Sequence, residues 1–289
     1  MFKKIIKNWL LPPAFYRLLI RCKTLLRKFI VTNYSKDYFI KNLNLKNANI
    51  GQRCFILGSG SSIKSQNLGR LIGEKVISVS NTFVHSDYSA IQPLYHVLPP
   101  LLNSHGQLNT ESNFVEWLRD METRTKKTSI FLHVGDRNLI TGNNLFVEQK
   151  IYWVNYCNWD GDFDFPIDLA NVPNIWSVSE LAITIALYLG FEKIYLLGFD
   201  HDWFNGPLVY FYDHKKNHSL KPDENKLINE YGVDAEFQMR RHADIFRKYK
   251  YLYSIHRNIF NANSNPDHYL DVFPKVDFES LFEIKTEGK

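Results

Sequence analysis

The sequence predicts an α/β fold with a mainly parallel sheet, and three observations lead to this prediction. A short apolar run at 53–58 leads directly into the turn Gly58-Ser-Gly-Ser-Ser62, as a buried first strand does. Similar apolar runs recur after spacers of helix length. Late in the chain, an apolar helix at 177–189 is followed at once by an apolar strand at 193–199, which makes half of a βαβ unit.

The other elements follow in order along the chain, after a polar connection at 32–50. We expect further strands at 76–80, 94–98, 129–134, 150–156 and 255–262. We expect further helices at 68–72, 110–125 and about 234–248.

The helix at 177–189 carries the clearest local signals. Ser177 is its expected N-cap, Glu180 stands three residues later as in a capping box, and Gly190 ends it. The strand at 193–199 should bring Asp200 to the carboxyl edge of the sheet. The polar, aromatic stretch 201–232 is long enough to be a lid over a site at that edge.

Length and composition are those of a globular protein: 289 residues, 45% of them hydrophobic and 22% charged. Disordered and collagen-like chains are therefore excluded. Cys22, Cys54 and Cys157 lie far apart without metal-binding spacing, so the sequence supports neither a disulfide framework nor a structural zinc site. A reducing compartment fits best.

Residues 1–49 are predicted to be a basic amphipathic segment preceding a domain at 50–289. Residues 1–36 contain nine Lys and Arg and no acid, so the remaining 253 residues sum to a charge of about −4. Apolar residues alternate with these charges, which favours contact of residues 1–30 with acidic lipid head groups. A basic helix packed on its own domain is the alternative.

Other roles of this segment are disfavoured. No uncharged run reaches the roughly 18 residues of a membrane span. Pro12-Pro13, Arg17 and Arg21 interrupt the apolar stretch, and no cleavage site follows, which argues against a signal peptide. Nucleic-acid binding is not expected, because the rest of the chain is slightly acidic and lacks a recognised motif.

The turn Gly58, Ser59, Gly60, Ser61 and Ser62 has two interpretations. Where a strand turns into a helix, free backbone N–H groups and the helix dipole can hold a phosphate. However, the third glycine of a dinucleotide-binding turn and the lysine of a P-loop are both missing, so a tight structural turn stays open.

Two Asp-x-Asp pairs could hold a divalent metal on a diphosphate, Asp200 with Asp202 and Asp160 with Asp162. Position at a strand end favours the first pair. The lid adds groups suited to acid–base chemistry and to hydrogen bonding of a leaving phosphate: His201, His214, His218, Trp203, Tyr210 and Tyr212. His242 and His256 are interpreted as structural.

Taken together, these motifs resemble the bacterial lipooligosaccharide sialyltransferases and the motility-associated-factor glycosyltransferases. The matching stretches are Gly58–Ser62, Asn81, Ser177–Ser179, Leu189–Asp200, Asn205-Gly206, Tyr210–Asp213, Asn261–Ser264 and Leu270–Asp277. The resemblance covers roughly residues 50–280.

The resemblance implies a single Rossmann-like domain, a variant of the GT-A glycosyltransferase fold. It implies an enzyme that moves a nonulosonate, a sialic acid-like sugar, from a donor activated by cytidine monophosphate (CMP) to a bacterial surface glycan. The anomeric centre would be inverted, without metal or cofactor. The acceptor would be an oligosaccharide or glycolipid, the enzyme would be cytoplasmic and peripheral on the inner membrane, and homo-oligomerisation stays open.

The resemblance also implies roles for single residues. Gly58–Ser62, Asn81 and Asp200 would bind the nucleotide of the donor, and Ser177 and Ser179 would also contact the donor. Tyr210 matches one of two tyrosines that bind the leaving phosphate. Trp203 stands at the position of the other, so Tyr212 is the expected substitute.

One departure concerns the general base. The family's histidine, some twenty residues beyond the Tyr-x-Phe-Asp segment, is absent from this sequence. His214, with His218 next, is the expected base, and Glu230 and Asp202 are carboxylate candidates. Two alternatives stay open: a magnesium-dependent diphosphokinase of the pterin type using Asp200 and Asp202, and a non-catalytic nucleotide- or glycan-binding scaffold.

Overall fold

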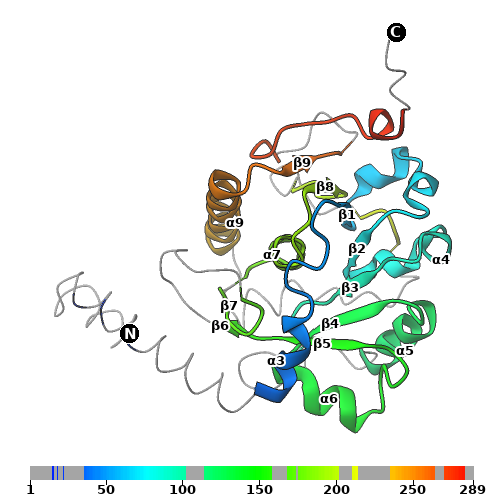
Figure 1. The fold of residues 1–289 in the computed structure, drawn as a ribbon, viewed down its shortest axis with the longest axis vertical. Coiled ribbons are helices and arrows are strands. Elements are labelled where there is room, and N and C mark those ends of the chain that lie inside the picture. Colours follow the sequence, from blue (N-terminus) through cyan, green and yellow to red (C-terminus); the bar gives the residue numbers. More distant parts are fainter. Residues whose placement is uncertain are drawn as a thin grey trace.

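A seven-stranded parallel sheet forms the centre of the computed structural model (Figure 1). The structure describes residues 36–101, 114–157, 168–173, 175–201, 210–213, 235–263 and 270–283, with Phe15, Leu18 and Cys22. The strands are β1 (Arg53–Leu57), β2 (Val76–Val79), β3 (Tyr95–Val97), β4 (Ser129–His133), β5 (Ile151–Val154), β8 (Lys193–Leu197) and β9 (Ile259–Asn261). A separate parallel pair consists of β6 (Tyr156–Cys157) and β7 (Val172–Pro173).

The strand order β5-β4-β3-β2-β1-β8-β9 puts the first strand inside the sheet. From β1 the chain continues to β2 on one side, whereas from β8 it continues to β9 on the other side. The carboxyl ends of β1 and β8 are therefore the point where the order reverses. In open α/β sheets, ligands bind in the crevice outside such a point.

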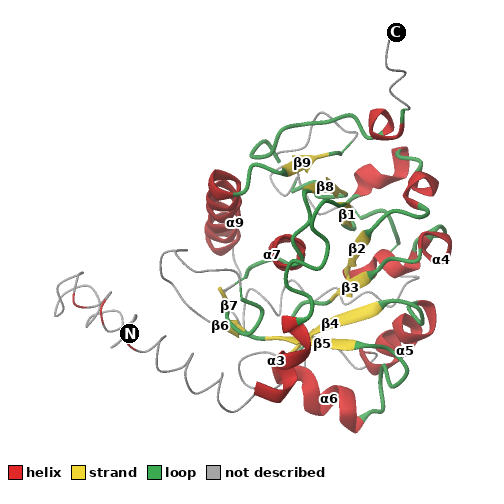
Figure 2. Ribbon diagram, in the orientation of Figure 1, coloured by secondary structure: helices red, strands yellow, loops and turns green. Residues whose placement is uncertain are grey.

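Helices cover both faces of the sheet (Figure 2). The α-helices are α3 (Lys36–Leu43), α4 (Tyr88–Ile91), α5 (Phe114–Arg124), α6 (Arg137–Gly142), α7 (Val178–Tyr188) and α9 (Ala235–Ile255). In Figure 1, α7 and α9 lie on one face and α4 and α5 on the other. This arrangement confirms the predicted α/β class, with a Rossmann-like parallel sheet.

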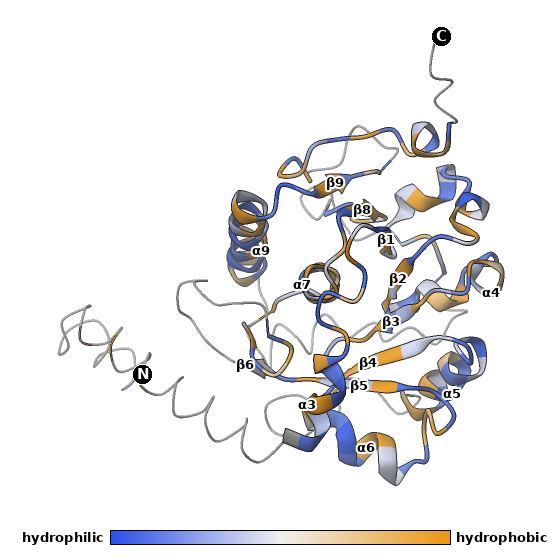
Figure 3. Cartoon of the chain, viewed as in Figure 1, coloured by the Kyte–Doolittle hydropathy of each residue, from blue (hydrophilic) through white to orange (hydrophobic). Residues whose placement is uncertain are grey.

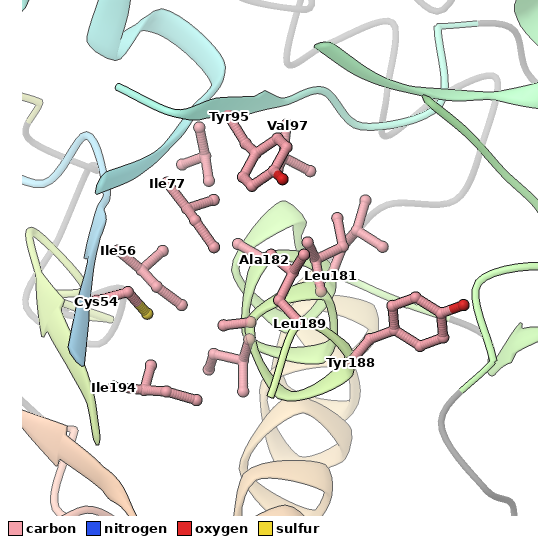
Figure 4. Packing of buried hydrophobic residues seen from close by; sticks show 14 of the residues in the cluster. Cys54, Ile56, Ile77, Tyr95, Val97, Leu181, Ala182, Tyr188, Leu189 and Ile194 are labelled. Atoms are coloured by element: carbon pink, nitrogen blue, oxygen red, sulfur yellow. The ribbon is translucent and has the colours of Figure 1, made fainter. Parts of the chain in front are cut away.

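The larger core lies between α7 and the sheet (Figure 4). Leu181 and Ala182 of α7 share this cluster with Cys54 and Ile56 of β1, and all four side chains are buried. Burial of apolar surface contributes about 25 cal/mol per Å², so this helix is a main source of stability. Because α7 leads directly into β8 and runs antiparallel to that strand, the N-terminus of α7 lies at the carboxyl edge of the sheet.

Successive side chains of a strand point to opposite faces of the sheet, so the strands also supply apolar side chains to the face away from α7. Phe55 and Leu57 of β1 point away from α7 and pack with Tyr195 and Leu197 of β8. Farther along the sheet, α5 and α6 cover β4 in a second cluster. Figure 3 shows apolar residues along β4, β5 and α7.

Two sequence expectations about helices are wrong. The predicted helix at 68–72 is a 3-10 turn, η3 (Leu68–Leu71), preceded by another, η2 (Ser61–Ser65). The polar connection at 32–50 contains α3, whose Asn42 amide donates to the Trp153 carbonyl at 2.7 Å. Among the other expected elements, α9 runs seven residues longer than predicted, to Ile255.

At the switch point the backbones after β1 and β8 touch. The Gly58 N–H donates to the Leu197 carbonyl at 2.7 Å, and the Gly60 N–H donates to the Gly198 carbonyl at 2.9 Å. A Cβ on Gly198 would stand 2.7 Å from the Gly58 carbonyl oxygen and 2.8 Å from Ile63 Cγ2. Gly198 also has a φ of 68°, which only glycine adopts without strain.

We expect Gly198→Ala to lower the free energy of unfolding by about 3 kcal/mol, because left-handed backbone strain adds to steric overlap. Gly73→Ala is the matched control: Gly73 has a φ of 85°, but nothing lies within 4 Å of its added Cβ. It should cost only about 1 kcal/mol. Urea unfolding measures both, and equal losses would contradict the proposed close approach.

Candidate functional site

The turn Gly58–Ser62, here named the edge turn, is held by a buried carboxylate. Asp200 is 4% exposed, and its Oδ1 accepts from the Ser62 hydroxyl at 2.5 Å while its Oδ2 accepts from the Ser62 N–H at 3.0 Å. The nearby Gly60 has no room for a Cβ, which would stand 2.4 Å from Asp200 Oδ2. The Asp200 carboxylate therefore holds the edge turn in place through its hydrogen bonds with Ser62.

The element after the edge turn is not the α-helix that the phosphate-binding interpretation assumes. An α-helix following the edge turn would have presented free N–H groups and a dipole. Instead η2 is a 3-10 helix of five residues, and the Ser62 N–H already donates to Asp200. The close approach of Gly58 and Gly60 to the turn after β8 accounts for both glycines structurally.

The segment 210–213, here named the tyrosine segment, lies beside the edge turn. Tyr210 forms an antiparallel bridge with Gly60, and the Phe211 N–H donates to the Ser59 carbonyl at 3.3 Å. The rings of Tyr210 and Tyr212 stack with centroids 5.3 Å apart. Two phenols from a distant part of the sequence are thus brought to the carboxyl edge.

Asn81 joins this group from the end of β2. It follows Ser80, whose φ of 50° is left-handed, at the start of η4 (Ser80–Val84). Its Oδ1 accepts from the Trp117 indole N–H at 2.6 Å, and its side chain also hydrogen-bonds Tyr212. Burial, and secondly the nearby Tyr210, raise the pKa of Tyr212, whereas the bond to Asn81 lowers it. The Tyr212 phenol is therefore protonated at neutral pH.

At the N-terminus of α7, Ser177 and Ser179 form hydrogen bonds of the helix cap. The Ser177 Oγ accepts from the Ser179 N–H at 3.2 Å, and the Ser177 hydroxyl donates to the Ser179 Oγ at 2.8 Å. Glu180 completes the predicted capping box by accepting from the Ser177 N–H at 2.7 Å. Ser179 also hydrogen-bonds the buried Tyr249 of α9.

A set of polar side chains, here named the α7–α9 cluster, lies between these two helices. Its members are Glu180, Arg241, His242, Lys248 and Tyr249. Glu180 is 2% exposed and pairs with the Lys248 ammonium at 2.9 Å. Burial raises the pKa of Glu180, against the effect of Lys248. The Arg241 Nε and Nη2 donate to the Trp176 carbonyl at 3.1 and 2.6 Å.

His201 connects this cluster to the end of β8. It has a left-handed φ of 51°, and its Nε2 lies 3.1 Å from the Tyr249 hydroxyl. Burial lowers the pKa of His201 to about 3, and the nearby His242 and Arg241 add to the shift. Burial also lowers the pKa of His242 to about 4. Both imidazoles are neutral at physiological pH.

The structure brings part of the expected site together. The edge turn, Asn81, Asp200 and the tyrosine segment are linked by the contacts given above, while Ser177 and Ser179 reach His201 through Tyr249. The expected bases and carboxylates His214, His218, Glu230 and Asp202 lie outside the described residues. So do Asp160, Asp162, Trp203, Asn205, Gly206 and most of the lid 201–232.

Two broader features concern the described residues only. In that part of the chain, no group of three or more His, Cys, Asp or Glu side chains is placed to hold a metal ion. A membrane-crossing helix is likewise absent there, since every described helix is too short or too polar.

Sequence reasoning missed Arg241. Its position could have been found from helical spacing, because Arg241, Ile245, Lys248 and Tyr249 recur at the intervals of one helix face, and that face is turned inward. The preceding Arg240 lies outside this face and pairs with Glu236 at the surface.

Comparisons with known proteins give a distant likeness in structure and none in sequence. No family model matches the chain, and no curated protein matches it in sequence. Among solved structures, the chain is similar to the sialyltransferase CstII from Campylobacter jejuni in complex with a substrate analogue, cytidine-5'-monophosphate. Sequence identity is 13% and the TM-score is 0.42, over 79% of this chain and 86% of that chain.

We expect Asp200→Asn to lower the free energy of unfolding of the ligand-free protein by about 1–3 kcal/mol. The amide offers only one acceptor oxygen, so one Ser62 donor loses its partner. The exposed Asp271→Asn is the control, with an expected change below about 0.5 kcal/mol. Unchanged urea unfolding of Asp200→Asn would show that this carboxylate does not hold the turn.

Proposed function

We propose that this chain is a glycosyltransferase that moves a nonulosonate from a CMP-activated donor to a bacterial surface glycan, with inversion and without a metal ion. One observation carries this proposal: the tyrosine segment lies against the edge turn at the strand-order switch point and hydrogen-bonds Asn81, which follows the neighbouring strand β2. These are three of the motifs in which the sequence resembles the sialyltransferases and motility-associated glycosyltransferases.

The proposed transfer needs one general base and a few hydrogen-bond donors from the protein. The acceptor hydroxyl oxygen attacks the anomeric carbon, the bond from that carbon to the phosphate oxygen breaks, and CMP leaves with the bonding electrons. Hydrogen-bond donors at the phosphate stabilise the growing charge, and a base takes the acceptor proton. Tyr210 and Tyr212 are the proposed donors, while Asn81 and the edge turn would hold the nucleotide. His214, with His218 next, remains the proposed base.

A nucleotide screen of the purified chain tests this function. A ligand that binds the native state raises the apparent melting temperature. We expect CMP to do so without magnesium, and UDP, GDP, ADP and ATP to have no effect. Transfer from a CMP-nonulosonate should fall about 10- to 100-fold in kcat/KM in Tyr210→Phe, which removes one phosphate donor.

Tyr253→Phe is the control, because Tyr253 lies near the opposite end of α9, packed on Phe273. Its transfer rate should equal that of the unchanged protein. Stabilisation only by ATP or a nucleoside diphosphate with magnesium would contradict the proposal in favour of a diphosphokinase. CMP binding without transfer would favour the non-catalytic scaffold.

We further propose that the enzyme acts in the cytoplasm at the inner-membrane surface, which residues 1–30 reach by their basic and apolar side chains. Support comes from the sequence, where the positive charge is concentrated in residues 1–36. Attraction to anionic head groups contributes about 1 kcal/mol per basic residue near the surface.

The full chain should cosediment with vesicles containing anionic lipid and not with neutral vesicles, and salt should release it. Changing Arg17, Arg21 and Arg27 to Gln removes three charges and should weaken binding about 100-fold. Equal binding to both kinds of vesicle, or to neither, would contradict a peripheral electrostatic attachment.

A further inference from the structure

Trp117 of α5 contacts the turn that follows β2. Its indole N–H donates to the Asn81 Oδ1 at 2.6 Å, although 36 residues separate the two in the sequence. The Trp117 ring also packs edge-on against Phe83 of η4, with centroids 6.1 Å apart, and stacks on Phe114 of α5 at 5.6 Å. Both Trp117 and Asn81 are buried. The indole is therefore held by packing, with its N–H directed at the Asn81 side chain.

This contact determines which way the amide of Asn81 faces. An asparagine side chain has an acceptor oxygen on one side and an NH2 group with two donors on the other, whereas an indole N–H can only donate. Trp117 therefore holds the amide with its oxygen toward α5 and its NH2 group away from it. In the reverse orientation two donors would face each other, and the buried indole N–H would lose its partner.

The tyrosine segment supplies the partner of this NH2 group. The chain leaves η4 through His85, whose ring lies against the ring of Phe211 with centroids 5.2 Å apart. The Asn81 side chain hydrogen-bonds Tyr212: burial raises the pKa of Tyr212, and this bond lowers it, as a donor to the phenol oxygen does. Asn81 thus donates to the Tyr212 oxygen. A hydroxyl that accepts a hydrogen bond becomes a stronger donor itself.

We propose that Trp117 is a positioning residue of the donor site, which acts by fixing the orientation of the Asn81 amide. This inference rests on the proposed function and names a residue that no motif indicated. With the amide held in this orientation, the Tyr212 hydroxyl is a better donor to the phosphate of CMP. If the amide turned over, it would present an acceptor oxygen where the leaving phosphate needs donors.

Calorimetric titration of the full chain with CMP tests this role in a double-mutant cycle. Trp117→Phe keeps an aromatic ring and removes the N–H group. The affinity for CMP should then fall about 5- to 20-fold, as expected when a buried polar group loses its partner. Asn81→Ala removes the group through which Trp117 acts. Adding Trp117→Phe to Asn81→Ala should therefore change the affinity for CMP less than about twofold.

Trp153→Phe is the matched control. Trp153 lies in β5 and packs against the same apolar cluster as Trp117, but β4 and β3 separate its strand from β2. This substitution should leave the affinity for CMP unchanged. Replacing Trp117 by benzothienylalanine provides a second variant if Trp117→Phe does not fold. This analogue has the shape of tryptophan with sulfur in place of the N–H group, and it should weaken CMP binding to the same extent.

The outcomes separate the two proposals. If the unchanged protein binds CMP and the Trp117 variants bind it equally well, only this inference fails. It also fails if Trp117→Phe weakens CMP binding by the same factor with Asn81 and with Asn81→Ala, because Trp117 would then merely support the fold. If the unchanged protein does not bind CMP, the proposed function fails, and this inference fails with it.

Discussion

Two glycine turns meet at the centre of the sheet's carboxyl edge, and the positions of the other edge residues depend on this contact. Because neither Gly58 nor Gly198 carries a side chain, the ends of β1 and β8 approach closely enough for backbone hydrogen bonds between the turns. Asp200 is thereby placed to bind Ser62 through both carboxylate oxygens. A Cβ at either glycine would push the two turns apart and displace the edge turn, against which the tyrosine segment lies.

The ionisable side chains near this contact are either neutral or in contact with other groups of the protein. Burial keeps the Tyr212 phenol protonated and the His201 imidazole neutral. The carboxylate of Glu180 is in contact with Lys248, and that of Asp200 is bound by Ser62. The phenols of Tyr210 and Tyr212 lie at this edge as hydrogen-bond donors, which suits a reaction whose leaving group becomes more negative as it departs.

The parts of the fold set by local patterns could be predicted from the sequence, whereas those set by distant contacts could not. The capping box of α7 and the apolar run of β8 lie in neighbouring residues, and both predictions are confirmed. The 3-10 geometry after β1 was not foreseeable, because the Ser62 N–H finds its partner 138 residues away. The buried position of Arg241 was not predicted, because it depends on which face of α9 packs against α7 rather than on where the helix begins and ends.

The most direct test of the central claim is a crystal structure of the full chain with CMP bound. The account predicts the nucleotide at the carboxyl ends of β1 and β8, beside the edge turn and Asn81, with its phosphate at the hydroxyls of Tyr210 and Tyr212. A nucleotide bound at the amino edge of the sheet, or one whose phosphate contacts neither Tyr210 nor Tyr212, would contradict it.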